Sequence, residues 1–193
     1  MGIPGSANLL LAAAEAEPYQ IEQSLRFTDA QYLQRTIGSA SSSTWTLSFW
    51  LKQTKPLEIS SDGDSYFYDS TGTNLYVNNN SSAGSDRYKI VDTNASSTRK
   101  AAGMTRDPSA WYHLVYWCDG SNNRLYVNGS LTSGWSASGS STHNGTTAIG
   151  RYRSATNSSG ATYLNGYLAE FHFVDGTALV PDGNFGEYDS SNV

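Results

Sequence analysis

The chain has 193 residues, of which 12 are Lys or Arg and 17 are Asp or Glu, so its formal net charge is −5. This acidity, with no basic run longer than Arg99-Lys100, argues against nucleic acid as a partner, because affinity for phosphates comes from clustered cations. Aromatic residues make up 12% of the chain, which is enough to build a core and argues against a disordered protein. The length fits one domain of about 150–200 residues.

Residues 1–18 differ in composition from the rest of the chain. They carry the apolar side chains Ile3, Leu9, Leu10 and Leu11. The apolar run Leu9–Ala14 is too short to span a bilayer, so we expect no membrane contact. The run lacks a basic flank and is not predicted to be a secretion signal. We expect residues 1–18 to form an N-terminal arm whose four apolar side chains make assembly contacts, either with its own domain or with a neighbouring subunit.

From residue 19 to residue 193 the pattern is one of short strands separated by turns. The clearest strand is 44–52, where Trp45, Leu47 and Phe49 recur with period two and point to one face. Residues 111–118 are apolar on both faces, which predicts a central strand covered on both sides. Further strands are expected at 20–27, 31–36, 65–69, 73–78, 86–91, 123–128, 146–151 and 163–174.

Sequences that tolerate left-handed backbone lie between these strands, as in Asp119-Gly120 and Asn128-Gly129, and they predict tight turns. Many short strands with hardly a helix predict an all-β protein built as a sandwich or a barrel. The single cysteine, Cys118, excludes an intramolecular disulfide and is expected to be a small buried hydrophobe.

Two longer stretches carry a resemblance to a known family. Trp111–Gly120, followed by Leu125-Tyr126-Val127-Asn128-Gly129, resembles the laminin G-like or concanavalin A-like lectin/glucanase pattern. Ile149-Gly150 and Leu164–Phe173 are similar to later strands of the same family. The resemblance implies a two-sheet antiparallel jelly-roll sandwich over residues 19–193, preceded by the arm. It leaves the function open, because this fold carries many unrelated activities.

The flanking segments carry a narrower resemblance. Ser24-Leu25-Arg26-Phe27 and Trp45–Trp50 are similar to the start of virion proteins of marine tailed bacteriophages, and Phe171–Leu179 is similar to their close. This implies a virion structural protein, made in the host cytoplasm and placed on the virion surface. The expected role is a capsid decoration or cement protein that contacts other virion proteins through its arm and forms a homo-oligomer. The alternative is a receptor-binding or tail-fibre module that recognises host glycans.

Catalytic patterns are absent from the sequence. A glycoside hydrolase needs two carboxylates that flank the sugar bond, and the run Glu-x-Asp-x-x-Glu of the glucanase relatives does not occur. Glu170 interrupts an apolar strand, and the favoured explanation is that it faces outward or bonds to a neighbouring loop. His113, His143 and His172 lack the spacing of a metal site. We therefore expect a protein that is not an enzyme.

Carbohydrate binding needs an exposed aromatic ring beside polar groups. Trp135, in a polar loop, and Tyr152, between two arginines and near Asn157, are the candidate carbohydrate-binding residues. The alternative is that Trp135 plugs the edge of the sandwich or a subunit contact.

Calcium is the one cofactor that the sequence suggests. Asp62, Asp64 and Asp119 supply hard oxygen ligands at turns, although their spacing matches no EF-hand loop. The alternative is that these Asp-Gly sequences are plain turns that bind no metal.

Overall fold

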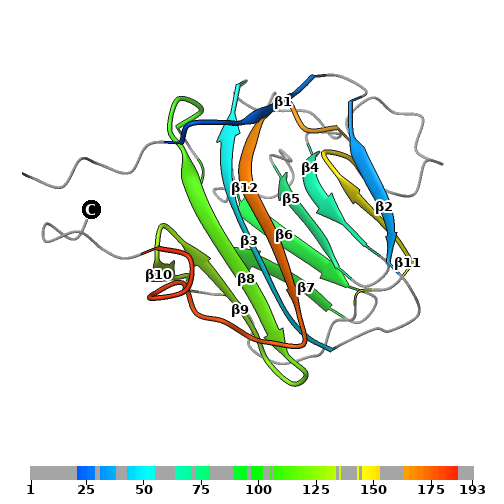
Figure 1. Cartoon of the computed structure of the whole chain (residues 1–193), viewed down its shortest axis with the longest axis vertical. Coiled ribbons are helices and arrows are strands. Elements are labelled where there is room, and N and C mark those ends of the chain that lie inside the picture. Colours follow the sequence, from blue (N-terminus) through cyan, green and yellow to red (C-terminus); the bar gives the residue numbers. More distant parts are fainter. Residues whose placement is uncertain are drawn as a thin grey trace, which may run out of the picture.

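Two antiparallel sheets lie face to face in the computed structural model (Figure 1). The structure describes residues 21–28, 31–37, 43–54, 64–70, 73–78, 89–94, 97–101, 105, 107–133, 135, 143, 145–152 and 163–186. These residues form twelve strands and no helix. The prediction of an all-β jelly-roll sandwich is therefore confirmed.

Sheet A has the strand order β1-β12-β3-β8-β9-β10. Its strands are β1 (Leu25–Phe27), β12 (Gly166–Asp175), β3 (Thr44–Gln53), β8 (Tyr112–Asp119), β9 (Asn123–Val127) and β10 (Ser130–Leu131). Sheet B has the strand order β2-β11-β4-β5-β6-β7. Its strands are β2 (Leu33–Ile37), β11 (Gly145–Ile149), β4 (Asp64–Asp69), β5 (Asn74–Asn78), β6 (Lys89–Asn94) and β7 (Ser97–Ala101).

The core lies between the sheets and is built by period-two alternation. In β3 the residues Trp45, Leu47, Phe49 and Leu51 are each fully buried. They meet the inward residues of β8 and β9 and, from sheet B, side chains such as Phe67. Burial of a large apolar side chain contributes about 1.5–3 kcal/mol, so this aromatic layer supplies much of the stability. Cys118 is buried within it, as predicted.

One buried histidine sits among the aromatic rings of the core. His143 is 2% exposed, and the centroid of its ring lies 4.0 Å from that of Trp45 and 5.0 Å from that of Phe173. Its Nδ1 is 2.6 Å from Oη of Tyr68 and 3.3 Å from Oγ of Ser70. Burial lowers the pKa of His143 from 6.5 to about 3, so the ring is neutral near neutral pH.

The turns confirm the reading of the Asp-Gly and Asn-Gly sequences. Asn128 and Gly129 have φ angles of 48° and 75°, as a two-residue hairpin with positive φ at both positions requires. In the other turn, Oδ1 of Asp119 accepts hydrogen bonds from the backbone N–H groups of Ser121 and Asn122. These local bonds fix the chain reversal between β8 and β9.

Several strand boundaries differ from the expected ones; the strand expected at 86–91, for example, is β6 at Lys89–Asn94. The first strand begins at Leu25 rather than at residue 20, since its ladder with β12 starts at the Leu25–Leu168 pair. Just beyond this pair, the ladder of β12 with β3 carries a β-bulge between Ala169 and His172. Strands β7 and β10 were not predicted, since neither Ser97–Ala101 nor Ser130–Leu131 shows an apolar alternation.

The N-terminal arm, with Ile3, Leu9, Leu10 and Leu11, lies outside the described residues.

Gly150 gives a direct test of the packing at the open edge of the sandwich. Its φ is +87°, and a Cβ there would lie 2.5 Å from the ring of Phe27. We expect Gly150→Ala to reduce the free energy of unfolding by about 2–5 kcal/mol, from backbone strain and overpacking. Gly176→Ala is the matched control, because Gly176 has φ +80° with nothing within 4 Å of the added Cβ. The control should lose only about 1–2 kcal/mol in urea unfolding, and equal losses in the two variants would contradict this account.

The buried neutral state of His143 predicts acid sensitivity. The folded-state pKa lies below that of the unfolded chain, so the unfolded state binds more protons once the pH falls below about 6.5. Stability from this residue is therefore complete above pH 6.5 and is lost toward pH 3, by about 1.4 kcal/mol per pH unit. Urea unfolding at pH 7 and pH 5 measures the slope. His143→Leu should roughly halve it, because His113, whose pKa burial also lowers to about 4, titrates in the same window. An unchanged slope would count against the assignment, even though the variant is weaker at pH 7.

Candidate functional site

The outward face of sheet A carries side chains that alternate with those of the core. In β3, Thr46, Ser48 and Trp50 point away from the core residues Leu47 and Phe49. The register pairs Trp50 with His113 and Ser48 with Val115, so His113 and Val115 of β8 point to the same outward face. The outward face is thus a second, chemically distinct surface of one sheet.

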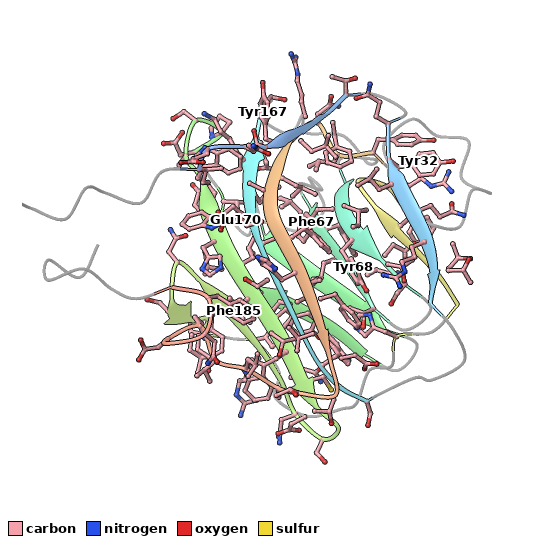
Figure 2. All side chains as sticks on the ribbon, in the orientation of Figure 1. Tyr32, Phe67, Tyr68, Tyr167, Glu170 and Phe185 are labelled. Carbon is pink, nitrogen blue, oxygen red and sulfur yellow. The ribbon has the colours of Figure 1, made fainter. Side chains whose placement is uncertain are left out.

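Half-buried aromatic rings are the main feature of this outward face. None of them belongs to the core cluster, and each keeps part of its surface exposed. We call these rings the aromatic face: Trp50, Trp111, Trp117, Tyr126 and Tyr167. Trp111 joins the set because its ring centroid lies 6.3 Å from that of Tyr167. Tyr167 stands at the β1 end of sheet A, as Figure 2 shows.

Cations accompany these rings, although the chain as a whole is acidic. The guanidinium carbon of Arg26 lies 5.9 Å from the ring centroid of Tyr167, and that of Arg124 lies 5.9 Å from the ring centroid of Trp117. Lys52 follows on β3, in register with Tyr167. Such contacts hold a guanidinium beside a ring and keep its N–H donors at the surface.

His113 is the buried centre of this face. Its ring stacks on that of Trp50 with centroids 4.8 Å apart and an interplanar angle of 24°. Its Nε2 lies 3.0 Å from Oγ of Ser48. Burial, and next the nearby charge of His172, lower the pKa of His113 from 6.5 to about 4. The neutral imidazole therefore acts as a rigid support that fixes the plane of the Trp50 indole.

The Ser48–His113 pair has the distance of a nucleophile and its base, yet its setting does not suit catalysis. Ser48 is 1% exposed, so a substrate cannot approach its hydroxyl. In the part of the chain that the structure describes, no carboxylate hydrogen bonds to the His113 ring to orient it. Glu170, the acidic residue that breaks the apolar pattern of β12, is exposed and makes no hydrogen bond with any described residue.

The segment that follows β12 covers the opposite end of the outward face. Oγ1 of Thr46 donates to the carbonyl of Thr177 at 2.7 Å and accepts from the N–H of Leu179 at 2.8 Å. The ring centroid of Phe185 lies 6.3 Å from that of His172 on β12. This cover explains why Thr46, a hydroxyl on the outward face, is fully buried. The rings of the aromatic face nearer β1, such as that of Tyr167, take no part in these contacts.

The structure corrects one of the carbohydrate-binding predictions. Trp135 is 7% exposed and packs edge-on against Tyr116, with ring centroids 5.4 Å apart, so it belongs to the core. A ring in this position offers no face to a sugar, and the alternative, a plug at the edge of the sandwich, describes it better. Tyr152 is half-buried and follows β11, whereas Asn157 lies outside the described residues. A site at Tyr152 and Asn157 therefore stays a prediction, while Trp135 is removed from the candidates by its burial.

Of the three metal ligands suggested by sequence, the structure describes the surroundings of Asp119 alone. Asp62 lies outside the described residues, and Asp64 begins β4. The Asp119 carboxylate is engaged in its own turn, where hydrogen bonds from Asn122 and Ser121 hold its pKa below the usual value. Within the described ranges, no three His, Cys, Asp or Glu side chains lie close enough to hold a metal ion. Calcium binding stays a prediction.

The aromatic face was not predicted from the sequence, because the polar loop around Trp135 indicated a different exposed tryptophan. The signal was present in the strand pattern, since Trp50 and Trp117 occupy outward positions between core residues in 44–52 and 111–118. Large aromatic rings that point outward from a strand indicate a candidate contact surface for a ligand or partner. None of the described segments is a helix long and apolar enough to cross a membrane.

Comparison with known proteins agrees with this architecture. A family model described as the concanavalin A-like lectin/glucanases superfamily matches residues 27–182. The chain is similar to domain 4 of an extracellular arabinanase from Geobacillus stearothermophilus, solved in complex with arabinotriose, with a TM-score of 0.52 and 17% identity over 76% of this chain and 67% of that one.

Two further solved structures share the fold. A putative carbohydrate-binding protein from Bacteroides ovatus has a TM-score of 0.56 and 15% identity, over 76% of this chain and 42% of that one. Laminin α1 domains LG4-5 from mouse have a TM-score of 0.56 and 12% identity, over 80% of this chain and 42% of that one. At these identities the likeness concerns the fold alone. No curated protein matches the sequence. The family match, which spans most of the chain and coincides with the two-sheet sandwich, places this protein in the concanavalin A-like lectin/glucanase superfamily.

Proposed function

We propose that this protein is a non-enzymatic glycan-binding module and that the aromatic face of sheet A is its contact surface. The observation that carries the proposal is the row of half-buried rings on the outward side of a sheet whose inward side already holds a complete aromatic core. Rings that the fold does not need for its core remain available to a ligand.

The chemistry of the aromatic face suits a sugar. The C–H groups of a pyranose pack on an aromatic ring, while its hydroxyls need directional donors and acceptors. Tyr167 and Trp111 supply rings near β1, and Arg26 and Lys52 supply N–H donors in the same region. The face is a sheet surface, which favours a glycan chain that lies across several strands over a single sugar in a deep pocket.

The rigidity of the surface supports the same role. Trp50 is held by its stack on His113, and His113 is held by Ser48, so the indole is oriented before any ligand arrives. A side chain that is already immobile loses little conformational entropy on binding. The similarity to the arabinotriose-bound domain and to the carbohydrate-binding protein agrees with the proposal.

The absence of catalysis is part of the proposal. Ser48 is buried, and Glu170 stands at a bulge on the exposed surface of β12. Hydrolysis of a glycosidic bond requires a pair of carboxylates within about 5–10 Å of each other across the sugar. We therefore expect binding without turnover for every glycan that the protein recognises.

Tyr167→Ala tests the aromatic face. The ring lies on the outward side of β12, and the core does not depend on it, so the variant should fold. We expect its affinity for the recognised glycan, measured by calorimetry after a glycan-array screen, to fall by about 10- to 100-fold.

Tyr32→Ala is the matched control for that measurement. Tyr32 is 41% exposed, lies beside β2 of sheet B and holds Arg151 over its ring at 3.6 Å, so it combines the same groups away from the aromatic face. Its glycan affinity should equal that of the wild type. Equal losses in both variants, or no binding by the wild type across a broad array of host polysaccharides, would refute the proposed surface.

For the biological setting we propose the surface of a virion, with the protein as a capsid decoration or cement protein. The sequence similarity of residues 24–27, 45–50 and 171–179 to phage virion proteins supports this setting. The last of these segments enters the cover of sheet A, where Thr177 and Leu179 bond to Thr46. Many copies on one particle would turn weak glycan contacts into useful avidity.

The setting is tested by particle attachment. The protein should co-purify with density-banded virus particles of the source that encodes it, and deletion of residues 2–17 should abolish that attachment if the arm is the tether. The soluble deletion variant should keep the circular dichroism and the thermal unfolding of the intact chain. Full occupancy by the deletion variant would exclude the arm, and absence of the intact chain from particles would exclude the setting.

A further inference from the structure

A groove opens at one edge of the sandwich, between β1 and β12 of sheet A and β2 and β11 of sheet B. Its volume is about 370 Å³. Most of its lining is apolar, from Phe27, Leu33, Ile149, Leu168 and Phe171. The groove is separate from the aromatic face, because Phe27 and Leu168 belong to the inward, core-facing set of sheet A.

The rim of this groove exposes unusually large apolar side chains. Leu25 is 48% exposed and Leu33 is 50% exposed, and each lines the groove. Tyr32, next to Leu33, is 41% exposed. Apolar surface left in water costs about 25 cal/mol per Å² relative to its burial. A rim of this kind, around an apolar hollow, indicates a docking surface.

Part of the backbone at the groove has no described strand beside it. β1 pairs with β12 only from Gly166 to Leu168, and the ladder stops at the Leu25–Leu168 pair, where β1 begins. Beyond this pair Glu170 has a φ of 48°, a conformation that residues other than glycine seldom adopt, and the ladder of β12 with β3 shifts register. Past Leu168, β12 has no described strand on its outer side. β2 is likewise the edge strand of sheet B. Two sheet edges thus face one apolar opening, which is the setting for strand addition.

We propose that this groove receives the segment Leu9–Leu11 of a second copy of the chain. The segment offers three consecutive leucines, and it lies in the 20 residues that precede the first described residue, Ile21. An extended peptide of this kind places alternate side chains in the hollow while its backbone bonds to a sheet edge.

The exposed leucines of the rim favour a second copy as the source, because contact between two copies would bury Leu25 and Leu33 as well as fill the groove. Gln23 and Ser24 themselves line the groove, so the N-terminal segment leaves each molecule at the rim of its own groove. In a two-fold dimer each segment would leave beside the groove of the partner, and one exchange would fill both grooves. The same arrangement brings together the exposed rims that contain Leu25 and Leu33. This inference does not depend on glycan binding, since the groove and the aromatic face share no ring.

Oligomeric state gives the first test. We expect the full chain to be a dimer by size-exclusion chromatography with light scattering, and Leu33→Asp to weaken the dimer by about tenfold or more. Leu131→Asp is the matched control, because Leu131 is 53% exposed on β10 at the other edge of sheet A. The control should remain as dimeric as the wild type. A monomeric full chain, or a dimer that both variants weaken equally, would overturn the proposal.

Cross-linking gives a second test that does not depend on the folding of an aspartate variant. The single native cysteine, Cys118, is buried, so new surface cysteines react without competition. Chains with Leu10→Cys and chains with Leu33→Cys, differing in tag length, should form a mixed disulfide dimer under mild oxidation. Leu10→Cys mixed with Leu131→Cys should not. In the double variant Leu10→Cys/Leu33→Cys, a disulfide confined to one chain would show that the segment fills its own groove, and this result would also overturn the proposal.

Discussion

The pairing of β3 with β8 in the middle of sheet A is the constraint on which the rest of the molecule depends. These two strands pair residue for residue from Thr44 to Leu51, and each is paired with a further strand on its other side. Because the side-chain period is two, the register sends Trp45 and Phe49 into the core and Trp50 to the opposite face. A slip of one residue would exchange the core residues for those of the aromatic face, so stability and the proposed function rest on the same hydrogen-bond ladder.

The sequence allowed this part of the fold to be predicted because local pattern and tertiary role coincide in it. The alternation in 44–52, the apolar run 111–118 and the turn Asn128-Gly129 each match the structure. The short strands β7 and β10 could not be found in this way, since their positions follow from pairing with β6 and β9 rather than from apolar residues of their own. A short stretch of sequence does not reveal the strand with which it pairs.

The site was harder to predict than the fold, for a reason that Trp135 illustrates. Its loop is polar, which suggested exposure, yet Tyr116 across the core supplies an aromatic partner that local sequence does not reveal. Trp50 is the converse case, because it lies in a clear strand, and its stacking partner, His113, is 63 positions away in the sequence. Contacts between strands decide which rings are buried. The sequence shows the alternation of side chains within one strand, but it does not show which distant residues pack against them.

β1 shows how a short strand can serve two surfaces at once. Successive side chains of a strand point to opposite faces, so Phe27 and Leu25 line the edge groove while Arg26 reaches the ring of Tyr167 on the aromatic face. β1 has only three residues, so its ladder leaves the edge of β12 beyond Leu168 open while Arg26 keeps its place beside Tyr167. Had the ladder continued to residue 20, as the sequence pattern suggested, residues 20–24 would have paired with the edge of β12 where the groove now opens. Two surfaces of different chemistry, one apolar and one aromatic with cations, therefore meet at this short strand, and its length decides whether the apolar one is accessible.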